Sequence, residues 1–438
     1  MISILNTAIW LAIAILLFLF RNDILWFIRA FKYIKQGISS RYYPLIGYAK
    51  YMDNPTSENG LEDWHKMILK KDDPTKSEPI ILVNGWGSNP VLYVNDPKLA
   101  QEYYKGLNTK FTQPLNLAKF PWGDCFLFKF NERGHTQRGV INELFKMENL
   151  KKLTPEINKI ILKRLGAIQK RVEEARTSDS QFAELALKED IGNLYSDINS
   201  FVLFGEEAAI VEGLPVTIQA ERVTNEFFMH SMTDFWHKLT GGLSTRLGLS
   251  AEHNRISKVH LAVHDEFKRM VNYRTNNKDY KRGLNMVDLM LNFNDRMEAE
   301  GRLDEVMTFQ EIVDNIYLMI FAGVDTAKNL TLNCIQLLAQ RQELQKRLRK
   351  TVQGEVFGHS SQKGACPDYD SFMDCELLDV FVNETLRLHG PSFTDTYHNV
   401  NKSFKLGEYK ISKGTGIMVN FMSLRTKPEY FERPWNSI

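Results

Sequence analysis

The sequence contains little cysteine. Its 438 residues include four, Cys125, Cys334, Cys366 and Cys375. No C-x-x-C pair is present, which excludes a zinc knuckle and a thioredoxin-like redox pair. Scattered single cysteines are typical of a reducing compartment, where they act as small buried apolar side chains. The chain is long enough to bury a large core without disulfide bonds.

An excess of charge of one sign is also absent. Lys and Arg total 55 and Asp and Glu total 53, so the formal net charge is +2. Nucleic-acid binding needs a basic excess on one surface, so no nucleic-acid partner is expected. The sequence has neither a G-x-S-x-G motif nor a phosphate-binding glycine loop. With 43% hydrophobic and 25% charged residues, the composition is that of a globular protein and excludes a disordered chain, a collagen-like repeat and a polytopic membrane protein.

The one long apolar run lies at the start of the sequence. Residues 1–20 carry no charged side chain, and 8–20 is unbroken. A membrane span needs roughly 20 apolar residues, with about 17 as the lower limit. The positive-inside rule then places the rest of the chain on the cytosolic side, because basic residues dominate the next segment: Arg21, Arg29, Lys32, Lys35 and Arg41 against Asp23.

The sequence therefore predicts a transmembrane signal-anchor over 1–20, with a buried core helix as the alternative. Residues 21–43 are predicted to be a linker and interfacial segment. Its apolar side chains at 24–28 and Phe31 would lie along the membrane surface.

Helical periodicity dominates from about 150 to 356, with breaks near 178, 205–215, 241–250 and 276–283. A capping box, Thr308-Phe-Gln-Glu311, predicts the start of a long apolar helix that reaches about 338. A further helix is expected at 377–388, before Gly390-Pro391. Asp96-Pro97 predicts another helix start. Short strands are expected at 80–83, 91–94, 404–406, 408–411 and 417–421. The predicted fold class is mainly α with a small antiparallel β-sheet element (α+β).

The long helix contains Ala322-Gly-Val-Asp-Thr326. A glycine inside a helix costs about 1 kcal/mol relative to alanine, so Gly323 indicates that something large packs against the bare backbone. Thr326 can hydrogen-bond to the carbonyl oxygen of Ala322. Asp325 places a proton source beside the Thr326 hydroxyl, which suits protonation of a small bound oxidant. The alternative is an incidental string in a buried helix.

The next apolar helix contains Glu384-Thr-Leu-Arg387, whose charged side chains share one face. A buried pair of this kind needs further partners. By itself E-x-x-R occurs by chance in many helices. His260 and His264 have a spacing that can hold zinc, but the neighbouring charges favour a solvated helix face.

The order of these motifs resembles the cytochrome P-450 superfamily of haem-thiolate monooxygenases. A-G-x-D-T is followed by a charged helix at 340–345, by E-T-L-R-L-H-G-P, and by a strand element that ends at Ile411-Ser-Lys-Gly-Thr415. Pro44-Leu-Ile-Gly47, Phe204-Gly205 and Arg425-x-x-Pro428 agree with it. The resemblance covers about 40–435, so 44–438 is expected to be a cytochrome P-450-like domain.

The resemblance implies that the long helix crosses the distal face of a haem. Asp325 and Thr326 would deliver protons for O–O bond cleavage, and Ala322 and Gly323 would pack against the cofactor. Arg138, seven residues before Phe145, would contact a haem propionate, whereas His135 departs from the family spacing. His398 would be a second propionate contact. Glu384 and Arg387 would be structural residues.

The implied function is insertion of one atom of O2 into an apolar organic substrate. Haem is the implied cofactor, and NADPH would supply electrons indirectly through a flavoprotein reductase. The expected location is the endoplasmic reticulum membrane, with the catalytic domain facing the cytosol. Aromatic and loop residues are expected to line the substrate pocket: 108–130, 227–229, Phe235, Trp236, Ile320, Phe321 and 392–395.

One departure concerns the axial ligand, which in this family is a cysteine thiolate. Its loop, F-x-x-G-x-R-x-C-x-G, would come after Arg433-Pro434, and none of the four cysteines has these neighbours. We therefore expect a chain that is C-terminally incomplete before the cysteine loop, with no metal ligand of its own. The alternative is a truncated, non-catalytic relative with weak or no haem binding.

Overall fold

The structure is a computed structural model. It describes residues 2–44, 78–84, 89–106, 109–111, 123–129, 132–177, 185–206, 209–233, 247–358, 366–395, 397–427 and 430–431. Several predicted features lie outside the described residues: most of the entry segment 44–47, the pocket segment 112–122, Phe235, Trp236 and residues 432–438.

The chain forms two compact units. Unit 1 comprises Met1–Phe120, Phe228–His253 and Ser392–Trp435, and unit 2 comprises Pro121–Phe227, Asn254–Pro391 and Asn436–Ile438. Unit 1 carries the six-stranded sheet, and unit 2 carries most of the described helices.

Unit 1 is built on a six-stranded sheet in the order β1-β2-β3-β10-β7-β4. Strands β2 and β3 form an antiparallel pair with Ile80 opposite Val94, which confirms the two predicted strands. The predicted antiparallel sheet is wrong in part, because β1 joins β2 and β10 joins β3 in parallel. A β8–β9 hairpin turns at Gly407, which has φ +55°. The bounds are β1 Ser39–Arg41, β2 Ile80–Asn84, β3 Pro90–Val94, β4 Thr109–Phe111, β7 His398–Val400, β8 Phe404–Leu406, β9 Tyr409–Ile411 and β10 Gly416–Val419.

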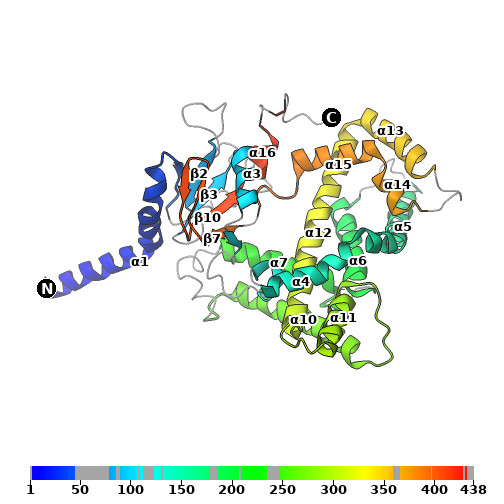
Figure 1. Ribbon diagram of the computed structural model, residues 1–438, viewed down its shortest axis with the longest axis horizontal. Coiled ribbons are helices and arrows are strands. Elements are labelled where there is room, and N and C mark those ends of the chain that lie inside the picture. Colours follow the sequence, from blue (N-terminus) through cyan, green and yellow to red (C-terminus); the bar gives the residue numbers. More distant parts are fainter. Residues whose placement is uncertain are drawn as a thin grey trace. The chain divides into compact units, whose positions relative to one another are not determined.

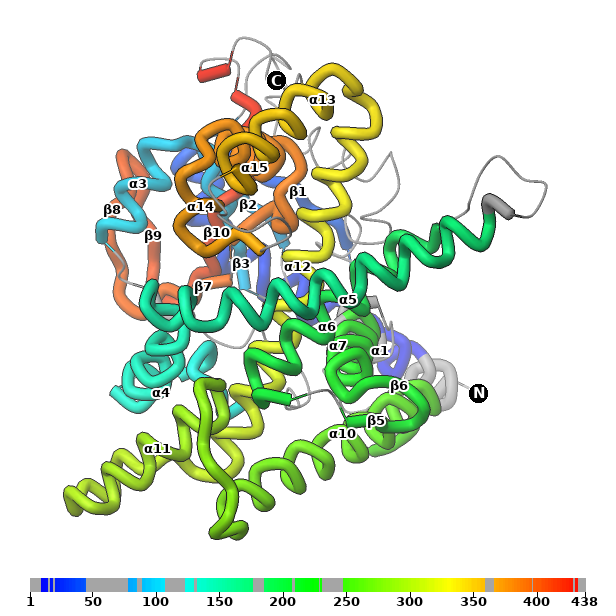
Figure 2. The backbone as a smooth tube through the Cα atoms, turned by 90° about the vertical axis from the view of Figure 1, so that its right-hand side faces the viewer, coloured from blue at the N-terminus to red at the C-terminus, as the bar shows by residue number. Residues whose placement is uncertain are grey.

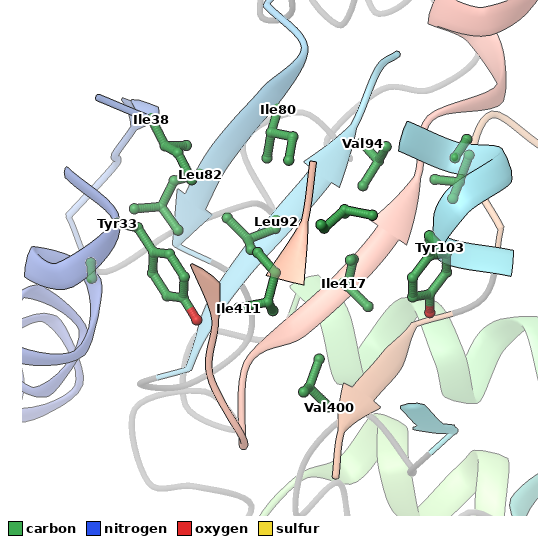
Figure 3. Packing of buried hydrophobic residues seen from close by; sticks show 14 of the residues in the cluster. Tyr33, Ile38, Ile80, Leu82, Leu92, Val94, Tyr103, Val400, Ile411 and Ile417 are labelled. Atoms are coloured by element: carbon green, nitrogen blue, oxygen red, sulfur yellow. The ribbon is translucent and has the colours of Figure 1, made fainter. Parts of the chain in front are cut away.

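Helix α1 (Ile2–Ile34) packs one face of its second half against this sheet. Trp26, Ala30 and Tyr33 recur at helical spacing and are buried. The Trp26 indole N–H donates to the carbonyl oxygen of Val83 at 3.2 Å. Figure 3 shows Tyr33 beside Ile38, the strand residues and Ile411 in one apolar cluster. In its described part this unit also contains α3 (Pro97–Gly106), which begins at Pro97 as predicted, and α16 (Phe421–Arg425).

The opposite face of α1 is exposed and apolar. Ile24, Phe27, Ile28 and Phe31 are all exposed, with Ile28 68% accessible. The interfacial prediction is therefore wrong for Trp26, which lies in the core, because helical periodicity gives the segment two apolar faces. Among the described helices none alone has the length and hydropathy of a membrane span, but the successive segments Ile9–Phe18 and Phe20–Ile34, bent by 55°, have them as a pair.

Unit 2 is helical, and the predicted helix breaks are confirmed where the structure describes them. Its helices are α4 (Glu132–Asn142), α5 (Met147–Thr177), α6 (Leu187–Phe204), α7 (Val216–Thr233, whose last residues belong to unit 1), α10 (Ala251–Asn276), α11 (Met286–Ala299), α12 (Phe309–Gln340), α13 (Gln342–Thr351), α14 (Tyr369–Met373) and α15 (Glu376–His389). A short hairpin of two-residue strands, β5 (Ile210–Val211) and β6 (Leu214–Pro215), precedes α7.

Helix α12 is the longest element at the centre of this unit (Figure 1). It starts at the predicted capping box, in which Thr308 and Glu311 bond each other's backbone N–H groups. Helix α6 lies along it, and α5 runs beside α6 (Figure 2). Near its C-terminal end Leu337 packs with Leu348 of α13 and Phe381 of α15. These contacts fix α12 as the rigid element on which the candidate site is built.

Candidate active site

The middle of α12 carries two exposed small side chains, Ala322 and Thr326. They lie one turn apart and so share a face, which we call the open strip. The helix before them is buried nearly all round, from Glu311 to Leu318. An exposed strip of small residues in a central helix is unusual, since such a helix normally buries its apolar surface against neighbours.

The Thr326 hydroxyl donates to the carbonyl oxygen of Ala322 at 2.7 Å, as the sequence predicts. This bond uses the hydroxyl proton and leaves the oxygen lone pairs available on the open strip. The side chain is therefore held in one orientation, from which it can accept a hydrogen bond.

Gly323 has a packing explanation. A Cβ added there would lie 2.7 Å from Oδ1 of Asn199 on α6, so only glycine allows this approach of α6 and α12. Close packing on the bare backbone is therefore observed, but the partner is the Asn199 side chain of the protein itself, and the packing of something larger there stays a prediction. The predicted contact of Gly323 with haem stays a prediction, which rests on its position next to Ala322 in α12.

Asp325 does not contact Thr326 through any hydrogen bond described in the structure. Its Oδ1 lies 2.7 Å from Nζ of Lys328, which also lies 2.8 Å from Oε1 of Glu221 on α7. Lys328 is a charged partner that the sequence reasoning missed. The signal for it in the sequence was a lysine three residues after Asp325, on the same face of the helix.

Glu384 and Arg387 form a bidentate pair on α15, with Nε–Oε2 at 2.7 Å and Nη2–Oε1 at 2.6 Å. Both side chains are mostly buried. Helix α15 is joined to α12 by Asn333, whose amide donates to the carbonyl oxygen of His389 at 2.8 Å. The pair therefore stiffens a helix that packs on the same α12 as the open strip.

Arg138 and His135 are both exposed on α4. The position four residues before Arg138, where the family often has Trp or His, is Gly134. A Cβ there would lie 1.8 Å from the carbonyl oxygen of Lys129, so this backbone excludes any side chain. The chain thus departs from the family at position 134 while keeping an exposed guanidinium at Arg138.

His398 lies in unit 1, on β7, whereas the other predicted site residues lie in unit 2. Its ring lies 6.0 Å from that of Tyr103, and its Nδ1 lies 3.9 Å from Oδ2 of Asp395. Burial lowers the pKa of His398, so the neutral imidazole is favoured. Its predicted propionate contact stays a prediction.

The prediction that His260 and His264 lie on a solvated face is wrong. Tyr317 of α12 packs on both rings and donates from its hydroxyl to the carbonyl oxygen of His260 at 3.0 Å. Nε2 of His264 lies 3.1 Å from the Gln310 amide nitrogen. Burial, with the neighbouring His264, lowers the pKa of His260 to about 4. No cluster of three or more metal-ligating side chains occurs among the described residues.

A family model described as cytochrome P450 matches residues 75–436 of the chain. The chain belongs to the cytochrome P450 family. Cytochrome P450 709B3 of Arabidopsis thaliana is 24% identical over 345 residues, which are 77% of this chain and 62% of that relative. Cytochrome P450 709B1 of the same plant is also 24% identical, over 344 residues that make up 78% of this chain. The chain therefore spans 62% of the length of these two relatives.

Two other relatives differ in coverage. Echinocystic acid 23-monooxygenase of Saponaria officinalis is 24% identical over 412 residues, 90% of this chain and 75% of the relative. Cytochrome P450 3A15 of Cavia porcellus is 30% identical over 164 residues, 37% of this chain and 30% of the relative. Membership in this family implies a haem cofactor.

The described residues of this P450 fit a haem on the distal side. The open strip offers small side chains against which a flat ring can pack, and Arg138 offers an exposed guanidinium for a carboxylate. Burial raises the pKa of the Cys125 thiol to about 12 and also raises the pKa of the Cys334 thiol, so neither is a thiolate at neutral pH in this structure.

Proposed function

We propose that this P450 is a haem-dependent monooxygenase that inserts one atom of O2 into an apolar organic substrate. NADPH would supply the electrons through a flavoprotein reductase. The observation that supports this most directly is the open strip, where Ala322 and Thr326 are exposed next to Asp325, just beyond the buried first half of α12. When bound, haem supplies the oxygen-activating chemistry.

The protein's own contribution is to bind, orient and deliver protons. Ala322 would pack against the cofactor, and Arg138 and His398 would hold its carboxylates. Glu384 and Arg387 would keep α15 rigid. The Thr326 hydroxyl would give its proton to a bound acceptor on the open strip. The Asp325 carboxylate, which is 40% exposed, would take up a proton from solvent and pass it to Thr326, which restores both groups.

The first test is spectroscopic. The protein expressed from the complete reading frame should give the reduced-carbonyl difference spectrum of a thiolate-ligated haem. A preparation that is folded, exposed to haem during expression and lacks this spectrum would contradict the proposal. It would favour the truncated, non-catalytic relative.

The second test is Thr326→Ala. Removing the hydroxyl should leave the reduced-carbonyl spectrum unchanged while the product formed per NADPH oxidised falls about tenfold or more, because general acid catalysis contributes roughly 10²–10⁴-fold in rate. Peroxide should rise correspondingly. Thr326→Ser keeps the hydroxyl and is the matched control. Equal coupling in the alanine and serine variants would remove Thr326 from proton delivery.

We also propose that α1 attaches the protein to the endoplasmic reticulum membrane, with the rest of the chain on the cytosolic side. The support is the exposed apolar face of α1 together with exposed basic residues on the same helix, Arg29 and Lys32. Such a face is typical of helices that insert into the interface of a bilayer.

A further inference from the structure

Three charged side chains of unit 2 meet where α7 approaches α12. Nζ of Lys328 lies 2.8 Å from Oε1 of Glu221 and 2.7 Å from Oδ1 of Asp325. We call these residues the charge trio. The Lys328 and Glu221 side chains are 11% and 13% exposed, whereas Asp325 is 40% exposed. Glu221 and Lys328 of the trio are therefore mostly buried, and Asp325 is the member that reaches the accessible surface of α12.

Packing fixes the lysine stem in this place. A Cβ added at Gly192 of α6 would lie 3.6 Å from Cδ of Lys328, so the stem passes over the bare backbone of that glycine. This is an ordinary packing distance, so the stem lies against α6 at Gly192. A buried, packed stem allows the ammonium group few positions, which fixes where Asp325 must go to reach it.

The charges favour the same arrangement. Burial raises the pKa of Glu221, as does the neighbouring Asp325, although Lys328 partly opposes this. Burial would lower the pKa of Lys328, but its hydrogen bonds to Asp325 and Glu221 outweigh burial and raise that pKa. The lysine therefore stays protonated at neutral pH and attracts both carboxylates, while the Thr326 hydroxyl bonds to Ala322 instead.

We propose that Lys328 is a positioning residue that holds the Asp325 carboxylate beside the open strip, with Glu221 anchoring it to α7. The inference rests on the proposed function and extends it, because it makes the placement of the proton donor depend on a contact with α7. A displacement of a catalytic group by about 1 Å can lower the reaction rate a hundredfold. The contact with Lys328 is therefore as important for the rate as the Asp325 carboxylate itself.

The experiment uses the haem-loaded protein from the complete reading frame and compares Lys328→Met, Lys328→Arg, Asp325→Asn and the double variant Asp325→Asn/Lys328→Met. Lys346→Met, which breaks the exposed Lys346–Glu343 pair of α13, is the matched control. The readouts are the reduced-carbonyl spectrum, substrate affinity by spectral titration, and product per NADPH as a function of pH.

We expect Lys328→Met to lower product per NADPH about tenfold and to change its pH profile, with unchanged spectrum and substrate affinity. Lys328→Arg should restore most of the coupling. The double variant should be no worse than Asp325→Asn alone, because Lys328 acts through Asp325. Lys346→Met should behave as wild type. If Lys328→Met keeps wild-type coupling and pH profile, or if its loss adds to that of Asp325→Asn, the inference is overturned.

Lys328→Met leaves Glu221 without its cation and can fail to fold. Lys328→Met combined with Glu221→Gln removes both charges with similar side-chain volumes and should fold, yet still show low coupling. A double-mutant cycle on denaturant unfolding should show energetic coupling between positions 221 and 328, with or without haem; additive effects would overturn the anchor. A wild-type protein without the thiolate spectrum would instead overturn the proposed function, while the cycle would still report on the trio.

Discussion

Glu311 shows how one buried carboxylate joins three segments of unit 2. Its oxygens accept from the Thr308 N–H at 2.7 Å, from Lys129 Nζ at 2.6 Å and from the Arg133 guanidinium. Burial alone would raise the pKa of Glu311, but the hydrogen bonds from Arg133, Lys129 and Thr308 lower it to about 2. The start of α12 is thus held to α4 and to the segment before it by a carboxylate that must remain ionised.

The expected consequence is a loss of stability in acid. The pKa of Glu311 is about 2 in the folded protein and near 4.5 when unfolded. The ionised pair is fully present above pH 4.5, and its stabilisation is lost as the pH falls toward 2. With screening at the partly exposed Lys129 and Arg133, the loss is about 2 kcal/mol.

Unfolding by denaturant at a series of pH values, compared with Glu311→Gln, measures this contribution. The variant should be less stable than wild type at about pH 7, and the difference should shrink steadily below pH 4.5. A constant difference from neutral pH down to about pH 3 would show that the carboxylate charge is not what holds the segments together.

For single residues, the sequence showed which side chains are charged or polar, but not which of them are buried or what they contact. Thr308 and Glu311 were predictable as a capping box because the motif is local, with its two members three residues apart. The burial of His260 and His264 was not, since Tyr317 lies 57 residues beyond His260 along the chain. Lys328 was missed for the same reason, because its second partner, Glu221, is on another helix.

Among the elements, α12 and α15 were predictable because their ends are marked in the sequence. The parallel pairing of β3 with β10 was not, because the partner strands lie far apart along the chain and no local signal specifies their direction. Helix α1 lies between these cases. The sequence showed that the segment is apolar, but it could not show which of these side chains pack against the sheet and which are exposed.

This division gives a test of α1 as an element of unit 1. Trp26 is 1% exposed and stacks on Tyr42 with ring centroids 5.1 Å apart. Trp26→Ala should lower the free energy of unfolding by about 3–5 kcal/mol, because it leaves a cavity against the sheet. Ile28→Ala, on the exposed face of the same helix, should change it by less than about 0.5 kcal/mol.

Thermal or denaturant unfolding in detergent measures both variants under one condition. Equal effects of the two substitutions would mean that α1 does not dock on the sheet in solution. The comparison separates docking from membrane attachment, because Trp26 faces the core and Ile28 faces away from it.

For the whole molecule the charge balance decides what kind of membrane attraction is possible. A formal net charge of +2 over 438 residues gives no long-range attraction to anionic lipid. Attachment through α1 must then rest mainly on burial of its exposed apolar side chains, with the exposed basic residues adding a smaller, salt-sensitive part.

The expected outcome is vesicle binding that resists salt. The protein should co-float with neutral phosphatidylcholine vesicles, and about 1 M NaCl, which reduces the Debye length to about 3 Å, should leave most of it bound. Removing residues 1–20 and replacing Ile24, Phe27, Ile28 and Phe31 by serine should release it, because both exposed apolar parts of α1 are then lost. Arg29→Gln together with Lys32→Gln should weaken only binding to anionic vesicles. Release of the wild-type protein by salt would mean that charge carries the attachment, and α1 would then lose its proposed role as an apolar anchor.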